Sequence, residues 1–177
     1  MGLDIKAGSK IVFIEAYNNS EVFEDKYYTY DPGKPCPYVN LYPERVFRNR
    51  HKPLKFDGKE FACYRIDGET FEFRAGSYGG YNDWREWLSR MANGLTPREI
   101  WQQRDKRKIR ALPFYPLIDF SDCRGTLGSI VAARLANDFA SHRERAERVG
   151  DAWQVAKYHK WHKACVLAAD DGFIKFT

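Results

Sequence analysis

An α+β fold, with an antiparallel sheet of hairpins in the N-terminal half and helices packed on it, is predicted by a change of hydrophobic period along the chain of 177 residues. Residues 10–15 form a β-branched apolar run, and residues 69–75 alternate apolar and polar side chains, as half-buried strands do. From residue 82 onward, apolar residues recur every three or four positions, as on one face of a helix. We expect a single domain over residues 1–177, mainly β over 1–75 and mainly α over 82–170. A short strand at 173–176 is expected to close it.

The N-terminal strands are expected to form a meander. Besides residues 10–15, strands are predicted at 21–30, 38–42 and 60–66, separated by turn and proline-rich segments. Asp57-Gly58 and Asp67-Gly68, which flank the last of these strands, are typical of hairpin turns. Strands joined by such turns predict neighbours that pair antiparallel.

Capping residues predict where the C-terminal helices begin. Residues 96–99, TPRE, form a capping box with proline at the first helical position, and this helix is expected to run toward Arg110. Residues 112–118 form an apolar connector with two prolines. A long helix is predicted from about Ser129, and Asp151 is the expected cap of the last helix.

Composition excludes several classes of protein. No run approaches eighteen apolar residues and the first residues lack a hydrophobic signal region, so a cytoplasmic protein is expected. The four cysteines are widely spaced without a CxxC motif, which argues against a zinc ribbon and favours reduced thiols. The net charge of +5 permits an acidic partner without requiring one.

The best candidate for a functional site is residues 71–91, FEFRAGSYGGYNDWREWLSRM. A glycine- and tyrosine-rich loop over residues 76–81 separates a predicted strand from an amphipathic helix, for which Asn82 is the expected N-cap. Backbone N–H groups at such a loop attract phosphate or carboxylate, and Tyr78 and Tyr81 could stack on a base. The spacing is that of neither a GxGxxG motif nor a Walker loop. A tight turn whose tyrosines pack on the domain is the slightly favoured alternative.

A second segment could line the same site. Residues 119–125, DFSDCRG, contain oxygen-bearing side chains but lack the ligands of a calcium loop, so a helix-entry turn is the simpler interpretation. No nucleophile elbow or paired catalytic carboxylates are evident, and no catalytic residue, cofactor or metal is predicted. The residues expected to bind a ligand are Arg74, Gly76, Ser77, Tyr78, Gly79, Gly80, Tyr81, Asn82, Arg85, Asp119, Ser121 and Asp122.

Two further groups of residues have competing explanations. His159, His162 and Cys165 are spaced three apart on one helix, where a boundary between core and solvent is favoured over a metal site. A basic cluster could be a solvated face, bind an acidic protein or, less favoured, bind nucleic acid. This cluster consists of Arg98, Arg104, Lys106, Arg107, Lys108 and Arg110.

Four segments together resemble a family of small proteins of bacteria and phages. They are the MGLD start, FRAGSYGGYNDWREWL, PFYPLIDFSDCRGTLG and WHKACVLAADDGFIKF, and they cover about half of the chain. The resemblance implies a bacterial or phage setting, in a bacterium or an infected host cell, and brings no activity to transfer. This chain departs from the family pattern at Arg124, where an acidic residue is common, which puts a metal role of that loop in doubt. The basic cluster is a second departure.

These observations lead to three functional hypotheses. The first is a non-catalytic protein that binds an anionic, nucleotide-like molecule at the glycine- and tyrosine-rich loop, for example to sequester a nucleotide immune signal. The second is an inhibitor or adaptor that uses the basic cluster against an acidic protein. The third is a small nucleotide hydrolase or transferase that uses Asp119, Asp122 or a histidine.

Overall fold

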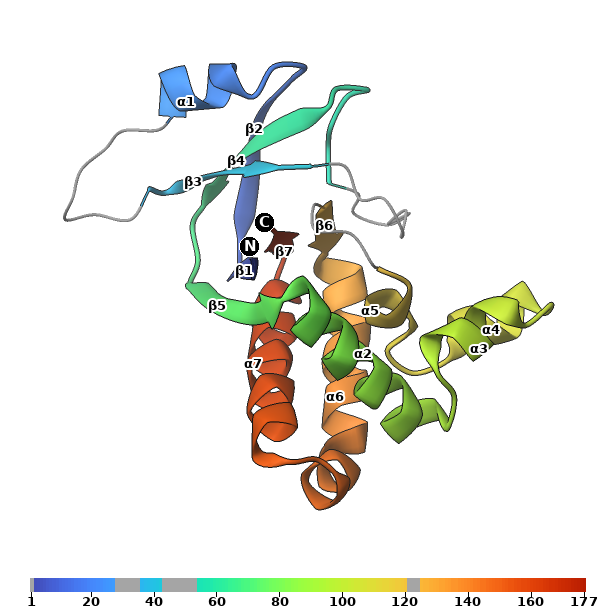
Figure 1. Cartoon of the computed structure of the whole chain (residues 1–177). Coiled ribbons are helices and arrows are strands. Elements are labelled where there is room, and N and C mark those ends of the chain that lie inside the picture. The colour runs from blue at the N-terminus through green and yellow to red at the C-terminus, as the bar shows by residue number, and fades with distance from the viewer. Residues whose placement is uncertain (1, 28–35, 43–53, 121–124) are drawn as a thin grey trace.

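The computed structural model describes residues 2–27, 36–42, 54–120 and 125–177. Strands dominate the first half of these residues and helices the second half, and a short strand closes the chain (Figure 1). The α+β class is therefore confirmed. Among the described residues, no helix combines the length and the apolar character needed to cross a membrane.

The strands divide between two sheets. The larger sheet contains β1 (Gly2–Gly8), β5 (Thr70–Ser77), β6 (Gly125–Gly128) and β7 (Phe173–Phe176) in the order β5-β1-β7-β6, with every pair antiparallel. The predicted closing strand, β7, is confirmed, and it lies in the interior of this sheet. Neither β1 nor the four-residue β6 was predicted, although Leu3, Ile5 and Ala7 alternate along β1 as its buried residues; β6 is too short to show a period.

The smaller sheet has the order β2-β4-β3, formed by β2 (Ile11–Tyr17), β3 (Tyr38–Leu41) and β4 (Phe61–Ile66). The meander prediction is wrong, because β4 lies between β2 and β3 rather than after them, and because Asp67-Gly68 does not close a hairpin. There the chain passes from β4 in the smaller sheet to β5 in the larger one, beside the similar passage from β1 to β2.

The two passages between the sheets are bonded to each other. The Ser9 N–H donates to the Glu69 carbonyl at 3.1 Å, and the Asp67 N–H donates to the Lys10 carbonyl at 3.0 Å. A side chain on Gly68 would collide with Ser9, so glycine is required by close backbone approach rather than by a hairpin turn. The result is a bent two-stranded ribbon that contributes to both sheets.

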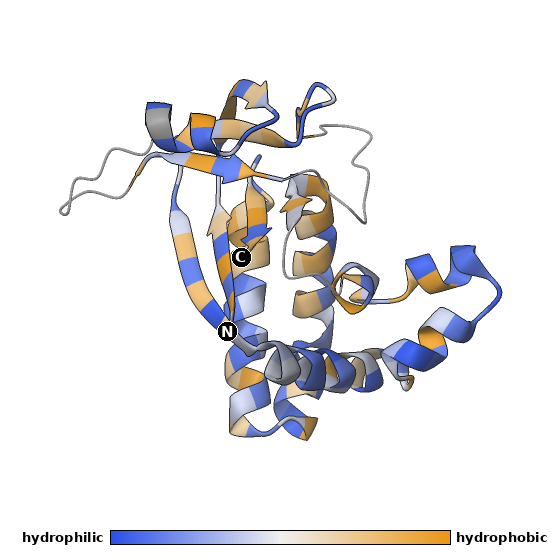
Figure 2. Cartoon of the chain, turned by 45° about the horizontal axis from the view of Figure 1, so that its top comes forward, coloured by the Kyte–Doolittle hydropathy of each residue, from blue (hydrophilic) through white to orange (hydrophobic). Residues whose placement is uncertain are grey.

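Three long helices cover the larger sheet. They are α2 (Tyr78–Asn93), α6 (Ser129–Val149) and α7 (Ala152–Ala168), of which α6 and α7 lie side by side (Figure 1). Hydrophobic and hydrophilic residues share the turns of these helices (Figure 2), and the hydrophobic ones supply the core. The helix start near Ser129 and the Asp151 cap are confirmed; Asp151 accepts from the Gln154 N–H at 2.8 Å.

Aromatic rings fill the space between helices and sheet. Trp161 of α7 stacks on Trp84 of α2 with 5.8 Å between ring centroids, and it meets Phe73 of β5 at 5.3 Å and Phe176 of β7 at 5.6 Å. Trp84 and Trp161 are fully buried. Because Trp161 contacts both strands and α2, the position of α2 depends on the packing of α7.

The basic segment forms an arm that projects from the body (Figure 1). We call residues 97–111 the arm; it contains α3 (Pro97–Gln102) and α4 (Lys106–Ala111). The capping box of α3 is confirmed, but the single helix expected to reach Arg110 is broken. Asp105 ends the continuity because its side chain accepts the N–H groups of Arg107 and Lys108 and so starts a new helix.

Two other expectations are wrong. Residues 21–27, predicted as part of a strand, form α1 (Glu21–Tyr27), which begins where Asn19 accepts the Glu21 N–H at 3.0 Å. Part of the predicted apolar connector is α5 (Tyr115–Asp119), a short helix with proline in its first turn. Tyrosine suggested β structure in the first segment, where the Asn19 cap favours helix, and proline suggested irregular structure in the second, where Pro116 occupies the first turn of a helix without a side-chain cap.

Candidate functional site

The predicted glycine- and tyrosine-rich loop is mostly the first turn of a helix. Strand β5 extends through Ser77, and α2 begins directly at Tyr78. Ser77 is the N-cap, since its hydroxyl accepts the Gly80 N–H at 3.0 Å. The prediction of Asn82 as the N-cap is therefore wrong. The helix begins earlier, because Ser77 caps it and Gly79 and Gly80 adopt helical structure in its first turn.

Tyr78 and Tyr81 lie in opposite environments. Tyr81 is 3% exposed, packs its ring 6.0 Å from that of Trp161, and donates its hydroxyl to the Leu117 carbonyl at 3.5 Å. Tyr78 is 36% exposed. The two tyrosines therefore do not form a pair of ligand-stacking rings, and Tyr81 belongs to the core.

The beginning of α2 is an open, positively polarised helix end. The first turn contains no acidic residue, and Ser77, Tyr78 and Gly79 are exposed. The Gly79 N–H group belongs to the first turn of α2, where backbone N–H groups have no intrahelical acceptor, and the helix dipole favours negative charge beside it. This end of α2 is suited to an anion.

A buried lysine from α7 lies next to this helix end. Lys157 is 8% exposed, and its ammonium donates to the Ala75 carbonyl. A β-carbon on Gly76, whose φ is +127°, would lie 3.2 Å from the Lys157 Nζ, so glycine leaves room for the amine. Burial, and secondarily the nearby Lys160, lower the pKa of Lys157, and no carboxylate in the part of the chain that the structure describes shifts it.

Trp153, one turn before Lys157 on α7, adds an exposed aromatic surface. Its indole is 46% exposed; the Lys157 Nζ lies 4.8 Å from its ring centroid, and the position of a Gly80 β-carbon lies 3.8 Å from the ring. We call the group that these contacts assemble the α2–α7 site. It comprises Ser77, Tyr78, Gly79, Gly80, Trp153 and Lys157.

The sequence contains a signal for the burial of this lysine. Trp153, Lys157 and Trp161 are spaced four apart, so they share one face of α7. A lysine between two tryptophans on such a face is expected to be partly buried. Its closeness to Gly76 could not be predicted, since it depends on how α7 packs against β5.

Arg74 is not available to this site. Its guanidinium pairs with Asp4 across the larger sheet at 3.5 Å, where both side chains are more than half exposed. The charge of Arg74 is therefore partly balanced within the protein.

Arg85 and Asn82 face the arm rather than the helix end. Arg85 is 7% exposed, donates to the Asn82 Oδ1 at 2.9 Å, and lies 5.8 Å from the ring centroid of Tyr81 and 5.6 Å from that of Trp101. Burial lowers the pKa of Arg85, while Tyr81 and Asp119 act in the opposite direction. Asp119 is thus near Arg85, one turn past the glycines of α2, whereas Ser121 and Asp122 lie outside the described residues.

The basic cluster is fully displayed on the arm. Each of its six members is exposed, and among the described residues the ion pair recorded for them joins Lys108 to Asp105 at 3.9 Å. This arrangement leaves a concentrated positive surface that is separate from the α2–α7 site.

The histidine spacing on α7 does not assemble a metal site in the described part of the chain, where no group of three or more potential ligand side chains comes together. His159 lies 3.3 Å from the Glu147 carboxylate, and His162 stacks on Phe139 at 5.9 Å. Burial raises the pKa of the Cys165 thiol, which keeps it protonated.

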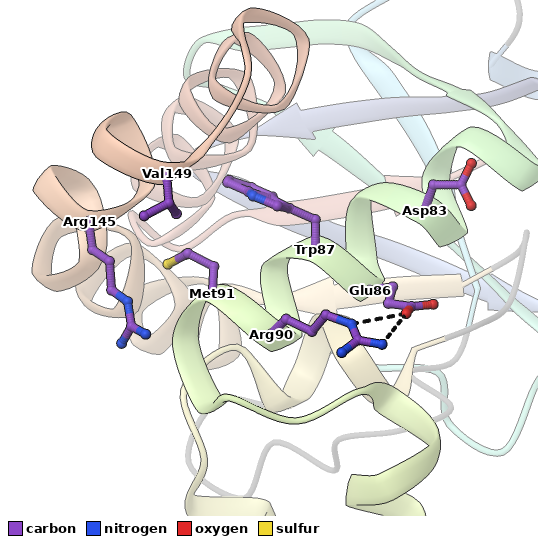
Figure 3. A pocket seen from close by; sticks show the side chains of 7 residues that line it. All are labelled: Asp83, Glu86, Trp87, Arg90, Met91, Arg145 and Val149. Carbon is purple, nitrogen blue, oxygen red and sulfur yellow. Dashed lines mark hydrogen bonds and ion pairs between the residues drawn. The ribbon is translucent and has the colours of Figure 1, made fainter.

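A groove of about 630 Å³ lies between α2 and the corner that joins α6 to α7 (Figure 3). Trp87, Met91 and Val149 supply its apolar surface, and the Arg90 guanidinium donates to the Glu86 carboxylate at 3.0 Å along its rim. None of the ligand-binding residues predicted from the sequence lines it.

Comparison of the chain with protein-family models, with curated proteins and with solved structures finds no match.

Proposed function

We propose that the protein binds an anionic, nucleotide-like small molecule at the α2–α7 site and leaves it chemically unchanged. The observation that carries this proposal is the buried Lys157 ammonium, which donates to a backbone carbonyl and whose pKa is shifted by no carboxylate of the described residues. A buried cation without an opposite charge is costly, and a bound anion would supply that charge.

The neighbours of Lys157 determine the kind of anion. The first-turn N–H groups of α2 can hold phosphate oxygens, and the dipole adds to the attraction. Trp153 and Tyr78 offer exposed rings for a base, in place of the Tyr78 and Tyr81 pair expected from the sequence. Phosphate and aromatic base together make a nucleotide the best-fitting class.

Binding without turnover would sequester the ligand. For the bacterial or phage setting that the resemblance implies, a nucleotide immune signal is the specific version of this function. Two features favour binding over hydrolysis: the site lacks a carboxylate or histidine that could activate water, and the predicted Asp119 lies on the side of Arg85.

The direct test is thermal unfolding of the protein with linear and cyclic nucleotides, with inorganic phosphate and pyrophosphate as separate probes. Wild-type protein should be stabilised by at least one nucleotide, with a Tm increase of roughly 5–10 °C at a ligand concentration 100-fold above Kd. Lys157→Met should abolish this shift. Lys163→Met, which removes an exposed lysine from the same helix, is the matched control and should bind normally.

Three results would contradict the proposal. One is the absence of stabilisation by every nucleotide tested. Another is equal binding by wild type and Lys157→Met. The third is conversion of the bound nucleotide to a product, detected by chromatography, which would instead favour a hydrolase or transferase. If inorganic phosphate bound more tightly than any nucleotide, the aromatic rings would not contribute to binding and the ligand would not be a nucleotide.

A further inference from the structure

The charge of the arm is concentrated because its two acidic residues are used for helix capping. Glu99 accepts both the N–H and the hydroxyl of Thr96, at 2.7 and 2.8 Å, and Asp105 accepts the Arg107 and Lys108 N–H groups. A carboxylate committed to a helix N-terminus balances the helix dipole as well as nearby cations. The basic side chains of the arm are therefore only weakly neutralised.

Most basic side chains of the arm have no carboxylate partner within the described part of the chain. Among the described residues, no ion pair is recorded for Arg98, Arg104 or Arg107, and all three are exposed. Arg98 lies in α3, Arg107 lies in α4, and Arg104 lies between the two helices. Their positive charges are therefore distributed along the arm instead of being gathered at one place. Such a row matches a chain of phosphates better than a single anion.

An exposed tryptophan lies within this row. Trp101 is 40% exposed, and Arg98 lies one helical turn before it. The buried Arg85 guanidinium lies 5.6 Å from the Trp101 ring, on the side of α2, and Lys106 donates to the Trp101 carbonyl at 3.4 Å. A ring fixed from its inner side by a cation presents its remaining surface to solvent as a stacking platform.

We propose that the arm is a binding surface for single-stranded nucleic acid. Arg98, Arg104 and Arg107 contact successive phosphates, and Trp101 stacks on a base between them. An acidic peptide would use the same charges but has no need of the ring. A duplex reader would need a longer element, because each six-residue helix of the arm spans only about 9 Å.

This surface is independent of the proposed nucleotide site. None of its residues belongs to the α2–α7 site, and the two lie at different ends of α2. Failure of one proposal therefore leaves the other testable, and Lys157→Met should bind single strands as wild type does.

The test is fluorescence anisotropy with labelled 20-nucleotide thymidine and uridine oligomers, a duplex and a polyglutamate peptide, over a range of salt concentrations. The variant Arg98→Gln/Arg104→Gln/Arg107→Gln should lower the slope of log K against log salt by about 2, since each phosphate contact contributes about 0.7. The control Lys59→Gln/Arg145→Gln/Arg148→Gln removes three exposed positive charges elsewhere and should retain the wild-type slope.

Trp101 distinguishes stacking from charge alone. Trp101→Ala should weaken binding of single strands on the order of tenfold, and Trp101→Phe should restore most of it. Circular dichroism must show that each variant is folded. Equal salt slopes for the arm and control variants would overturn the proposal, as would polyglutamate binding as tight as that of the oligomers, which would identify an acidic protein as the partner.

Discussion

At the scale of single residues, burial of the Lys157 charge lowers the stability of the fold, while the same charge would bind the proposed anion. Its ammonium is held against the Ala75 carbonyl in surroundings that lower its pKa. Lys157→Met removes the buried charge and keeps the length of the side chain, at the loss of one hydrogen bond. In urea titration, we expect the free energy of unfolding of the ligand-free variant to lie within about 1 kcal/mol of the wild-type value. Stabilisation by the ligand should be lost. A loss of several kcal/mol would instead identify Lys157 as a structural residue.

The lowered pKa of Lys157 also makes binding depend on pH. The anion needs the protonated amine, and in the ligand-free protein that proton is lost below the ordinary lysine value of 10.5. Affinity should therefore fall as pH rises through the alkaline range, starting below pH 10.5, and titration calorimetry should detect proton uptake on binding there. An affinity independent of pH in that range would exclude the amine from the site.

Tyr81 and Tyr78 provide a matched pair of substitutions. Tyr81→Ala removes a buried ring that packs on two tryptophans, so we expect a loss of about 3–5 kcal/mol in the free energy of unfolding. Tyr78→Ala changes a half-exposed ring and should cost no more than about 0.5 kcal/mol while weakening the nucleotide. Denaturant titration measures both, and equal costs would contradict the different environments of the two rings.

His162 should contribute to the acid sensitivity of the fold. Burial, then Arg143 and His159, lower its pKa below the ordinary value of 6.5, so the folded protein binds fewer protons than the unfolded chain just below that pH. Stability should therefore be lost as pH falls below about 6.5, and recovered as pH rises. In His162→Gln the slope of stability against pH between 5 and 6.5 should be smaller; an unchanged slope would assign the acid sensitivity to other groups.

At the scale of elements, loss of the capping box of α3 and loss of that of α7 should have different effects on stability, although the hydrogen bonds are similar. Asp151→Ala removes the cap of α7, which packs in the core, and should lower global stability by about 1 kcal/mol. Thr96→Ala removes the cap of α3, a six-residue helix of the projecting arm, and should mainly loosen the arm. Hydrogen exchange of the arm amides, read together with urea unfolding, separates local from global loss.

The elements that sequence predicted correctly have local causes. The starts of α3 and α7 follow from nearby caps, α6 follows from its apolar periodicity, and β2, β4 and β5 follow from their apolar residues. The division into two sheets, the pairing of β7 and the break at Asp105 depend on distant contacts or on competing caps. The candidate site divides the same way, because Ser77 and Tyr78 are local to α2 whereas Lys157 arrives from α7.

At the scale of the whole molecule, β7 joins the two ends of the larger sheet. Its Phe176 is fully buried and packs 4.3 Å from the Phe120 ring and 5.6 Å from that of Trp161. Phe176→Ala should cost about 3–5 kcal/mol, a large share of the stability of a domain, which is typically 5–15 kcal/mol. Lys175→Ala, on the other face of the strand, should cost less than about 1 kcal/mol in the same urea experiment.

The interior place of β7 also has a consequence for biosynthesis. In a growing chain β1 and β5 can pair long before residues 173–176 leave the ribosome, so one edge of β1 stays open during translation. Among the described strands β6 pairs only with β7, so it too needs residues 173–176 before it can join the sheet. Until residues 173–176 are made, the nascent protein therefore exposes an unpaired edge of β1, and such edges can pair with other chains and aggregate.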